Sequence, residues 1–154
     1  MNLQHALLAP AISLLLAVTT GCGDDDAIPG GDAPCAAGEI SFVGTMGGSS
    51  VDASYAYTGA VFSQLGTPSL EVSFNGEGGA AGDLFLTWPS IISDGDQTEV
   101  TGTLTWPSPS GATATSHDVA PGSIMTPTEE DKYYFSLDLD GGDHVDGCAD
   151  MEVF

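Results

Sequence analysis

Four aspartates are clustered in one short stretch of the chain, DLDGGDHVD, around a pair of glycines. They are Asp138, Asp140, Asp143 and Asp146. Carboxylate oxygens on a flexible turn are the ligands that Ca²⁺ prefers, so this stretch is a candidate calcium site. It is not an EF-hand loop, because the twelfth position counted from Asp138 is Ala149, where an EF-hand has glutamate. The two glycines favour the alternative, a hairpin turn whose acids are solvated.

The pentapeptide LTWPS occurs twice, and each copy ends a candidate strand with a tryptophan, Trp88 or Trp106. Paired surface tryptophans offer flat faces on which sugar rings can stack, so the two are candidate ligand-binding residues. The alternative is that both are buried, in strands that stop at a proline because proline cannot donate to the ladder. If the two strands form a hairpin, Trp88 lies beside its loop and Trp106 lies at the far end. We therefore expect core packing.

The histidines do not form a ready-made catalytic pair. His117 and Asp118 are neighbours, as are Asp143 and His144. Adjacent residues of a strand point to opposite faces, so neither pair is expected to act as a dyad. The chain contains no GxSxG or HExxH motif and no phosphate-binding glycine loop. We expect a protein that is not an enzyme, with a hydrolase assembled from separate loops as the alternative.

The charge of the chain limits its partners. There are 22 acidic residues against one base, and the formal net charge is −21. Without a basic patch, we expect no binding to nucleic acid. Without an arginine, the chain also lacks the fork that binds phosphate or carboxylate ligands. The charged partners that remain are cations such as Ca²⁺ and basic proteins, and the simplest alternative is a solvated acidic surface.

Alternation of apolar and polar residues predicts the elements that carry these side chains. Period two is typical of strands with one buried face, and no window after residue 23 shows a helical period. Gly-Gly, Asn-Gly, Asp-Gly and Pro-Gly pairs separate the runs. We therefore predict an all-β fold, a single antiparallel β-sandwich, with a small β-barrel as the alternative. The expected strands are Glu39–Met46, Val51–Tyr57, Ser69–Asn75, Asp83–Trp88, Glu99–Trp106, Lys132–Asp140 and Val145–Phe154.

The N-terminal stretch has the pattern of a signal peptide. An apolar run of thirteen residues, Ala6–Val18, is too short for a membrane-spanning helix and ends at small residues before Cys22. Thr20, Gly21 and Cys22 resemble the lipobox of bacterial lipoproteins. The resemblance implies that Cys22 is lipidated and becomes the first residue of the mature chain. The alternative is an ordinary secretory signal, with Cys22 either paired or free.

This resemblance divides the chain into three parts. Residues 1–21 are the signal peptide, residues 22–34 are a lipidated acidic linker rich in Gly, Pro and Asp, and residues 35–154 are the β-domain. The membrane is then contacted through the lipid anchor only. Gly23 rather than aspartate follows the cysteine, and by analogy with Gram-negative lipoproteins this favours the outer membrane or the cell surface.

If Cys22 carries lipid, Cys35 and Cys148 remain and can pair. Their bond would close a loop of more than a hundred residues, which is worth about 4–5 kcal/mol in the chain-entropy model, and would make the first and last strands neighbours. In a regular strand, however, Cys148 lies on the face opposite Val145. We therefore interpret Gly147 as a bulge that reorients it.

Taken with the resemblance, these features lead to the expectation of a lipid-anchored envelope or cell-surface protein. Its domain would be a non-enzymatic binding or structural module with a protein or glycan partner. One alternative is an adhesion or carbohydrate-binding module that depends on Ca²⁺, the one cofactor under consideration. The other is a secreted hydrolase.

Overall fold

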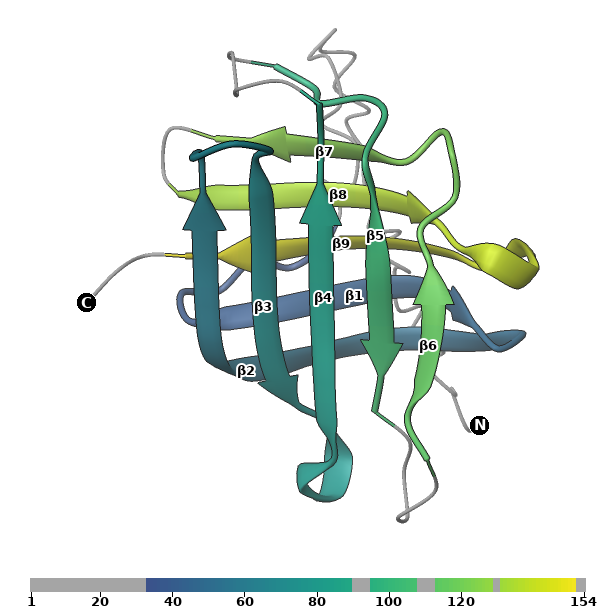
Figure 1. Ribbon diagram of the computed structural model, residues 1–154. Helices are drawn as coiled ribbons and strands as arrows, with labels where there is room; N and C mark the ends of the chain where they lie inside the picture. Colours follow the sequence, from purple (N-terminus) through teal and green to yellow (C-terminus); the bar gives the residue numbers. More distant parts are fainter. Residues whose placement is uncertain (1–32, 90–94, 108–112, 129–130, 152–154) are drawn as a thin grey trace, which may run out of the picture.

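A computed structural model describes residues 33–89, 95–107, 113–128 and 131–151 (Figure 1). The predicted signal peptide, Cys22 and most of the linker lie outside these ranges. The described part of the chain contains nine strands and two single-turn 3₁₀ helices, and the all-β prediction is confirmed. The elements are β1 (Glu39–Met46), β2 (Ser49–Ser63), β3 (Ser69–Asn75), η1 (Glu77–Gly79), β4 (Ala81–Thr87), β5 (Thr101–Trp106), β6 (Thr115–Asp118), β7 (Ile124–Pro127), β8 (Lys132–Asp138), η3 (Asp140–Gly142) and β9 (His144–Asp150).

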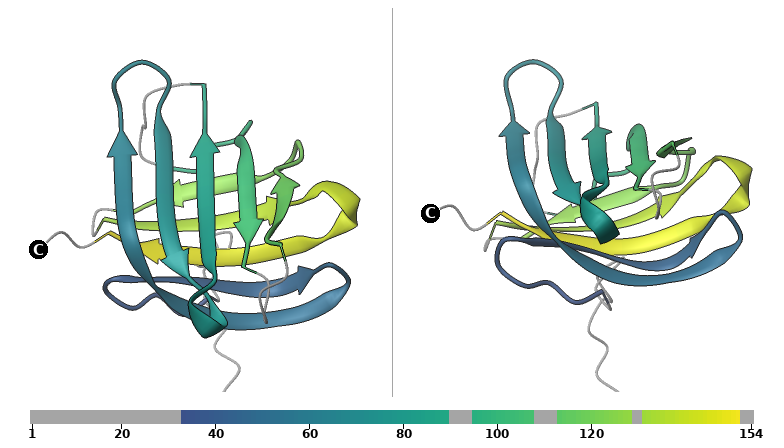
Figure 2. Two further views of the ribbon diagram at one scale, coloured as in Figure 1. Left: turned by 60° about the horizontal axis from the view of Figure 1, so that its bottom comes forward. Right: turned by 90° about the horizontal axis from the view of Figure 1, so that it is seen from below.

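All nine strands belong to one antiparallel sheet with the order β6-β5-β4-β3-β2-β1-β9-β8-β7. The sheet curls on itself, so that β3 to β6 cross in front of β1, β9, β8 and β7 (Figure 1). The views in Figure 2 show the two halves facing each other as a half-barrel. The two layers expected of a sandwich are therefore present, but they are two parts of one continuous sheet.

The strand β2 connects the two halves. It has fifteen residues, and its first part pairs with β1 while its second part pairs with β3. The register shifts between Tyr57 and Gly59, which marks an irregularity where one partner replaces the other. Such a bulge bends a strand and increases its twist, which is what folding the sheet over requires. The bend in β2 therefore places the half of the sheet that begins with β3 over the half that contains β1.

Two isolated bridges join the halves again on the side opposite β2. Gln97, which precedes β5, pairs with Met125 of β7, and Val119, which follows β6, pairs with Leu139 after β8. Both members of the first bridge exchange backbone hydrogen bonds, at 2.7 and 3.0 Å. These bridges hold the ends of the curled sheet near each other without adding a full strand pairing.

The space between the layers is filled by the apolar residues of each alternating run. Phe42 of β1 lies at its centre, fully buried. Its ring centroid is 5.4 Å from that of Phe74, 5.2 Å from that of Trp106 and 5.7 Å from that of Phe135, so it contacts side chains of both layers. Aromatic pairs at these separations add to the stability gained from buried area alone. The predicted inward faces are therefore confirmed for these strands.

The first and last strands are neighbours, as the predicted cysteine pair requires. Cys35 and Cys148 are bonded, with their Cα atoms 5.4 Å apart, and Ser41 of β1 is opposite Cys148 of β9. The predicted bulge at Gly147 is wrong, because the register of β9 is continuous with both of its neighbours. Cys148 instead points to the outer face of the sheet. The segment that carries Cys35 crosses that face, where Ser41 donates to the Pro34 carbonyl and, at 3.4 Å, to the Cys148 carbonyl.

The structure also adds elements that the alternation did not indicate. The short strands β6 and β7 were not expected, and β2 is longer than the predicted Val51–Tyr57. The predicted strand Val145–Phe154 corresponds to β9, and its last three residues lie outside the described ranges. No helix in the described ranges is long and apolar enough to cross a membrane.

Candidate functional site

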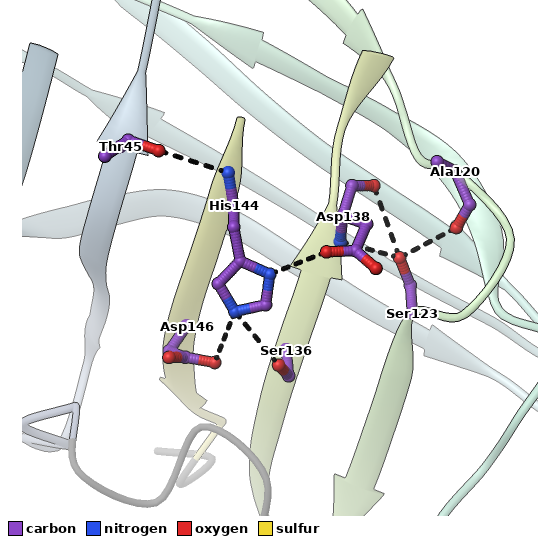
Figure 3. Close-up of polar contacts among 7 residues, drawn as sticks. All are labelled: Thr45, Ala120, Ser123, Ser136, Asp138, His144 and Asp146. Carbon is purple, nitrogen blue, oxygen red and sulfur yellow. Dashed lines mark hydrogen bonds and ion pairs between the residues drawn. The ribbon is translucent and has the colours of Figure 1, made fainter. Parts of the chain in front are cut away.

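His144 lies within a group of polar side chains on the outer face of β8 and β9 (Figure 3). The register pairs His144 with Asp138 and pairs Asp146 with Ser136, which places the four on one face. The Nδ1 atom of His144 is 2.8 Å from Asp138 Oδ1. Its Nε2 atom is 3.3 Å from Asp146 Oδ1 and 3.4 Å from Ser136 Oγ. We call these four residues the histidine clasp.

Backbone contacts fix the clasp to the strands on either side. The N–H of His144 donates to Thr45 Oγ1 of β1 at 3.3 Å. On the other side, the N–H of Asp138 donates to Ser123 Oγ at 3.0 Å, and that hydroxyl donates to the Ala120 carbonyl at 2.9 Å (Figure 3). The imidazole is therefore held between β1 and the segment that leads into β7.

The clasp favours a protonated histidine. The pKa of His144 is raised above its usual 6.5, chiefly by the hydrogen bond to Asp138; desolvation opposes the shift, and the charges of Asp146 and Asp138 add to it. With carboxylates at both ring nitrogens, an imidazolium can donate to both of them. When His144 is protonated, it therefore joins the two strands through ion pairs with Asp138 and Asp146.

Three members of the clasp also have the connectivity of a Ser–His–Asp relay, in the order Ser136, His144 and Asp138. A general base must be neutral, and its Nε2 must be available to accept the serine proton. Here the Asp146 carboxylate is as close to Nε2 as the serine oxygen is. The side chain of His144 is 47% exposed, which leaves it open to water. Ser136 and Asp146 therefore compete for the same ring nitrogen of His144.

The other two predicted calcium ligands have partners of their own. The Asp140 carboxylate is 3.3 Å from Nδ1 of His117. The Asp143 carboxylate accepts from the N–H groups of Gly47 and Gly48, at 2.6 and 3.1 Å, and so caps the turn between β1 and β2. Each acid therefore stabilises a different junction of the sheet.

The four candidate calcium ligands are not gathered in one place, as the alternative of a hairpin turn expects. Asp138 and Asp146 contact His144, whereas Asp140 and Asp143 face a second histidine and a glycine turn. Within the described ranges, no group of three or more His, Cys, Asp or Glu residues could hold a metal ion. The physical reason is the turn: β8 ends at Asp138, and Asp140 and Asp143 lie in and directly after η3, so the alternation of the strands does not set the direction of these two side chains.

The two tryptophans lie at opposite ends of the β4–β5 hairpin, as its geometry predicts. Thr87, next to Trp88, pairs with Thr101, whereas Trp106 ends β5 beyond the pair of Asp83 and Thr105. A shared sugar-binding platform is therefore not formed. Trp88 is 1% exposed and stacks on Phe62 at 6.0 Å, which confirms core packing for this residue.

Trp106 is only partly buried and lines a hollow of about 250 Å³ at one open end of the half-barrel. We call this the Trp106 hollow. Its walls come from the start of β2, the turn η1 and the end of β5. Residues that line it include Val51, Ala53, Tyr55, Glu77, Trp106 and Pro107. Of these, only Trp106 was identified from the sequence, because Tyr55 and Glu77 are brought to it by the curl of the sheet.

A second hollow, of about 280 Å³, lies at the other end of the same hairpin and is lined by residues around Trp88 and Glu99. Neither hollow includes a member of the histidine clasp. The clasp and the two hollows are therefore separate features. The Trp106 hollow combines a partly buried aromatic wall with two carboxylate residues, Asp52 and Glu77, and a mainly apolar wall with a few polar groups is the usual composition of a small-ligand site.

Comparison with known proteins adds no assignment to this geometry. No protein-family model, curated protein or solved structure matches the chain.

Proposed function

We propose that this protein is a lipid-anchored, non-enzymatic binding or structural module of a bacterial cell envelope. In this proposal Cys22 carries the acyl chains and residues 35–154 form the displayed domain. The observation that carries it is the bond between Cys35 and Cys148. That bond accounts for two of the three cysteines and leaves Cys22 for the lipid. Disulfides of this kind persist in oxidising compartments such as the periplasm and the cell surface.

The point where the linker enters the domain supports an anchoring role. Ala33 is 5% exposed, and the carbonyl of Pro34 accepts from Ser41 of β1, so the chain is already packed on the sheet at this point. Cys35 then ties it to β9, which lies in the interior of the sheet order. A pull on the linker is therefore passed to interior strands rather than to an edge strand.

The length of the linker sets the distance from the membrane. Ten residues, 23–32, separate Cys22 from Ala33. Fully extended, they span at most about 35 Å. Their aspartates and the net charge of −21 would be repelled by anionic headgroups, which favours a domain held away from the lipid surface.

The histidine clasp supports the non-enzymatic part of the proposal. A hydrolase based on His144 would need a neutral imidazole with Nε2 directed at a nucleophile. Instead the Asp146 carboxylate is as close to Nε2 as the Ser136 hydroxyl is, and the clasp is part of neither the Trp106 hollow nor the hollow around Trp88. We therefore assign the clasp a role in joining strands.

Replacement of Cys22 tests the anchor. In a bacterial host that processes lipoproteins, mass spectrometry of the wild-type mature protein should find acyl chains on an N-terminal Cys22. The Cys22→Ala variant should leave the membrane fraction. A matched control, the Cys35→Ala and Cys148→Ala double variant, should stay in the membrane fraction although its domain is less stable. A mature wild-type protein that starts elsewhere, or that carries an unmodified Cys22, would overturn the proposal.

A further inference from the structure

We propose that the Trp106 hollow binds a small organic cation, whose ammonium group lies against the aromatic wall and near the carboxylate of Glu77. This ligand class deepens the binding role proposed above and rests on it. The site is distinct from Cys22, so acylation and ligand binding can be tested separately.

The aromatic wall of the hollow is held in place by the core. The ring of Tyr55 stacks on that of Phe74, with centroids 5.4 Å apart and planes at 15°. It meets the indole of Trp106 at 5.9 Å, with planes at 68°. Trp106 in turn packs edge-on against the fully buried Phe42 at 5.2 Å. Because Phe42 and Phe74 are buried, the two rings that face the hollow are already ordered before a ligand arrives, which lowers the entropic cost of binding.

Two glycines bring Glu77 to the hollow. A Cβ atom at Gly76 would lie 2.4 Å from the Cγ of Pro107, and one at Gly82 would lie 2.9 Å from its Cδ. The absence of these side chains lets Pro107, the residue after Trp106, pack directly against the β3–β4 turn. That turn carries Glu77 in η1. The end of β5 and the acidic turn thus meet at one place.

The charged groups around the hollow determine that a ligand should be positively charged. The pKa of Tyr55 is raised, first by burial and then by the charge of Glu77, so the phenol stays neutral next to the carboxylate. No lysine or arginine is among the residues that line the hollow. Aromatic rings and the carboxylates of Asp52 and Glu77 all attract a cation, and the net charge of −21 raises the local concentration of cations. An anion is repelled by the same groups, and a neutral molecule gains the stacking contact alone.

The size of the site limits the ligand. About 250 Å³ is below the roughly 300–1,000 Å³ that is usual for sites of drug-sized ligands. A headgroup-sized cation such as a quaternary ammonium compound matches this volume and is the kind of ligand that aromatic faces recognise best.

Choline and its neutral isostere, 3,3-dimethylbutan-1-ol, test the proposal on the mature protein with its native N-terminus. In a Trp88→Phe background, Trp106 is the single tryptophan, and its fluorescence reports on the hollow. Choline should give a saturable change in fluorescence that the isostere does not give. Sodium chloride at the same ionic strength should not change the fluorescence of Trp106. Acylation of Cys22 is measured on the same sample by mass spectrometry, so a failure of the anchor and a failure of the site are distinguished.

Charge-neutral variants locate the site. Glu77→Gln should weaken choline binding by up to about fivefold, the range expected for an exposed ion pair. Glu71→Gln, which removes the same charge from an exposed position of β3, should leave it unchanged. Glu77 lies in an exposed turn, so its variant is expected to fold even if a Trp106 variant does not. Equal binding of the isostere, equal effects of the two glutamine variants, or no saturable response to choline would each overturn the proposal.

Discussion

The ring of Phe135 occupies the space that a side chain at residue 147 would need. Phe135 of β8 and Gly147 of β9 are directly paired, and a Cβ atom built on Gly147 would lie 2.2 Å from Cε2 of the ring. The same atom would be 2.4 Å from the carbonyl oxygen of Ser41 on the other side. The glycine thus lets the aromatic ring lie across the strand and reach Phe42 at 5.7 Å.

Adding one methyl group at this point should therefore be costly. We expect Gly147→Ala to lower the free energy of unfolding by at least about 1–3 kcal/mol, because the buried ring and the backbone of β1 must both move. Urea denaturation followed by circular dichroism measures the change. Gly59→Ala is the matched control, since a Cβ atom there meets nothing within 4 Å. Similar losses in the two variants would show that the contact with Phe135 is not the cause.

The same glycine shows where sequence reasoning succeeded and where it failed. Alternation correctly placed Val145 and Cys148 on opposite faces of β9, although both are buried, and the cysteine count correctly paired Cys35 with Cys148. The interpretation of Gly147 as a bulge that reorients Cys148 is wrong. In the structure the strand is regular and the preceding segment crosses the outer face instead. Gly147 instead leaves room for the ring of Phe135, the residue paired with it on β8. That pairing is known only from the strand register.

The site residues were harder to predict, for a related reason. The sequence correctly excluded adjacent His–Asp pairs, since neighbours in a strand diverge, but His144 finds Asp138 across the β8–β9 register. Trp106 was identified by its repeat, whereas Tyr55 and Glu77 carry no local signal. They reach Trp106 because β2 bends and the sheet curls over. The alternation of apolar and polar residues indicates which face of each strand is buried. It does not indicate which side chains of distant strands are brought into contact by the curl of the sheet.

Reduction of the disulfide should destabilise the domain strongly. Cys35 and Cys148 are 113 positions apart, and in the chain-entropy model a loop of this size is worth about 4–5 kcal/mol. Chemical denaturation with and without reductant should show this difference, because most of it arises in the unfolded chain. The Cys35→Ala variant should already have the lower stability and should not respond to reductant. A variant as stable as the oxidised wild type would contradict the role given to this bond.

Calcium should act on the domain only as a counterion. Its four candidate ligands are divided among separate partners, so Ca²⁺ and Mg²⁺ should raise the melting temperature equally by screening the repulsion within a chain of net charge −21. Thermal melting in matched chloride salts measures this. Asp143→Asn, which weakens the cap on the Gly47–Gly48 turn, should lower the melting temperature to the same extent in either salt. A saturable increase in melting temperature with Ca²⁺ but not with Mg²⁺ would contradict this prediction and support a calcium site.

The histidine clasp should make stability depend on pH near neutrality. Because the folded-state pKa of His144 is raised above 6.5, the folded protein binds more protons than the unfolded chain between 6.5 and that higher value. The contribution of the clasp is therefore complete below pH 6.5 and is lost as the pH rises through the folded pKa. The side chain of His144 is 47% exposed, so screening limits the effect to about 0.2–1 kcal/mol.

Comparison with His144→Gln isolates this contribution, because the two proteins differ at that one residue only. Denaturation at a series of pH values from 6 to 8 should show the wild type losing its advantage over the variant as the pH rises. Asp138→Asn removes the main cause of the shift and should flatten the difference. Glu71→Gln, on the exposed face of another strand, should keep the wild-type pH dependence. If the stability of wild type relative to His144→Gln instead increases with pH, His144 is neutral in the folded protein, and a base at this position becomes the better interpretation of the clasp.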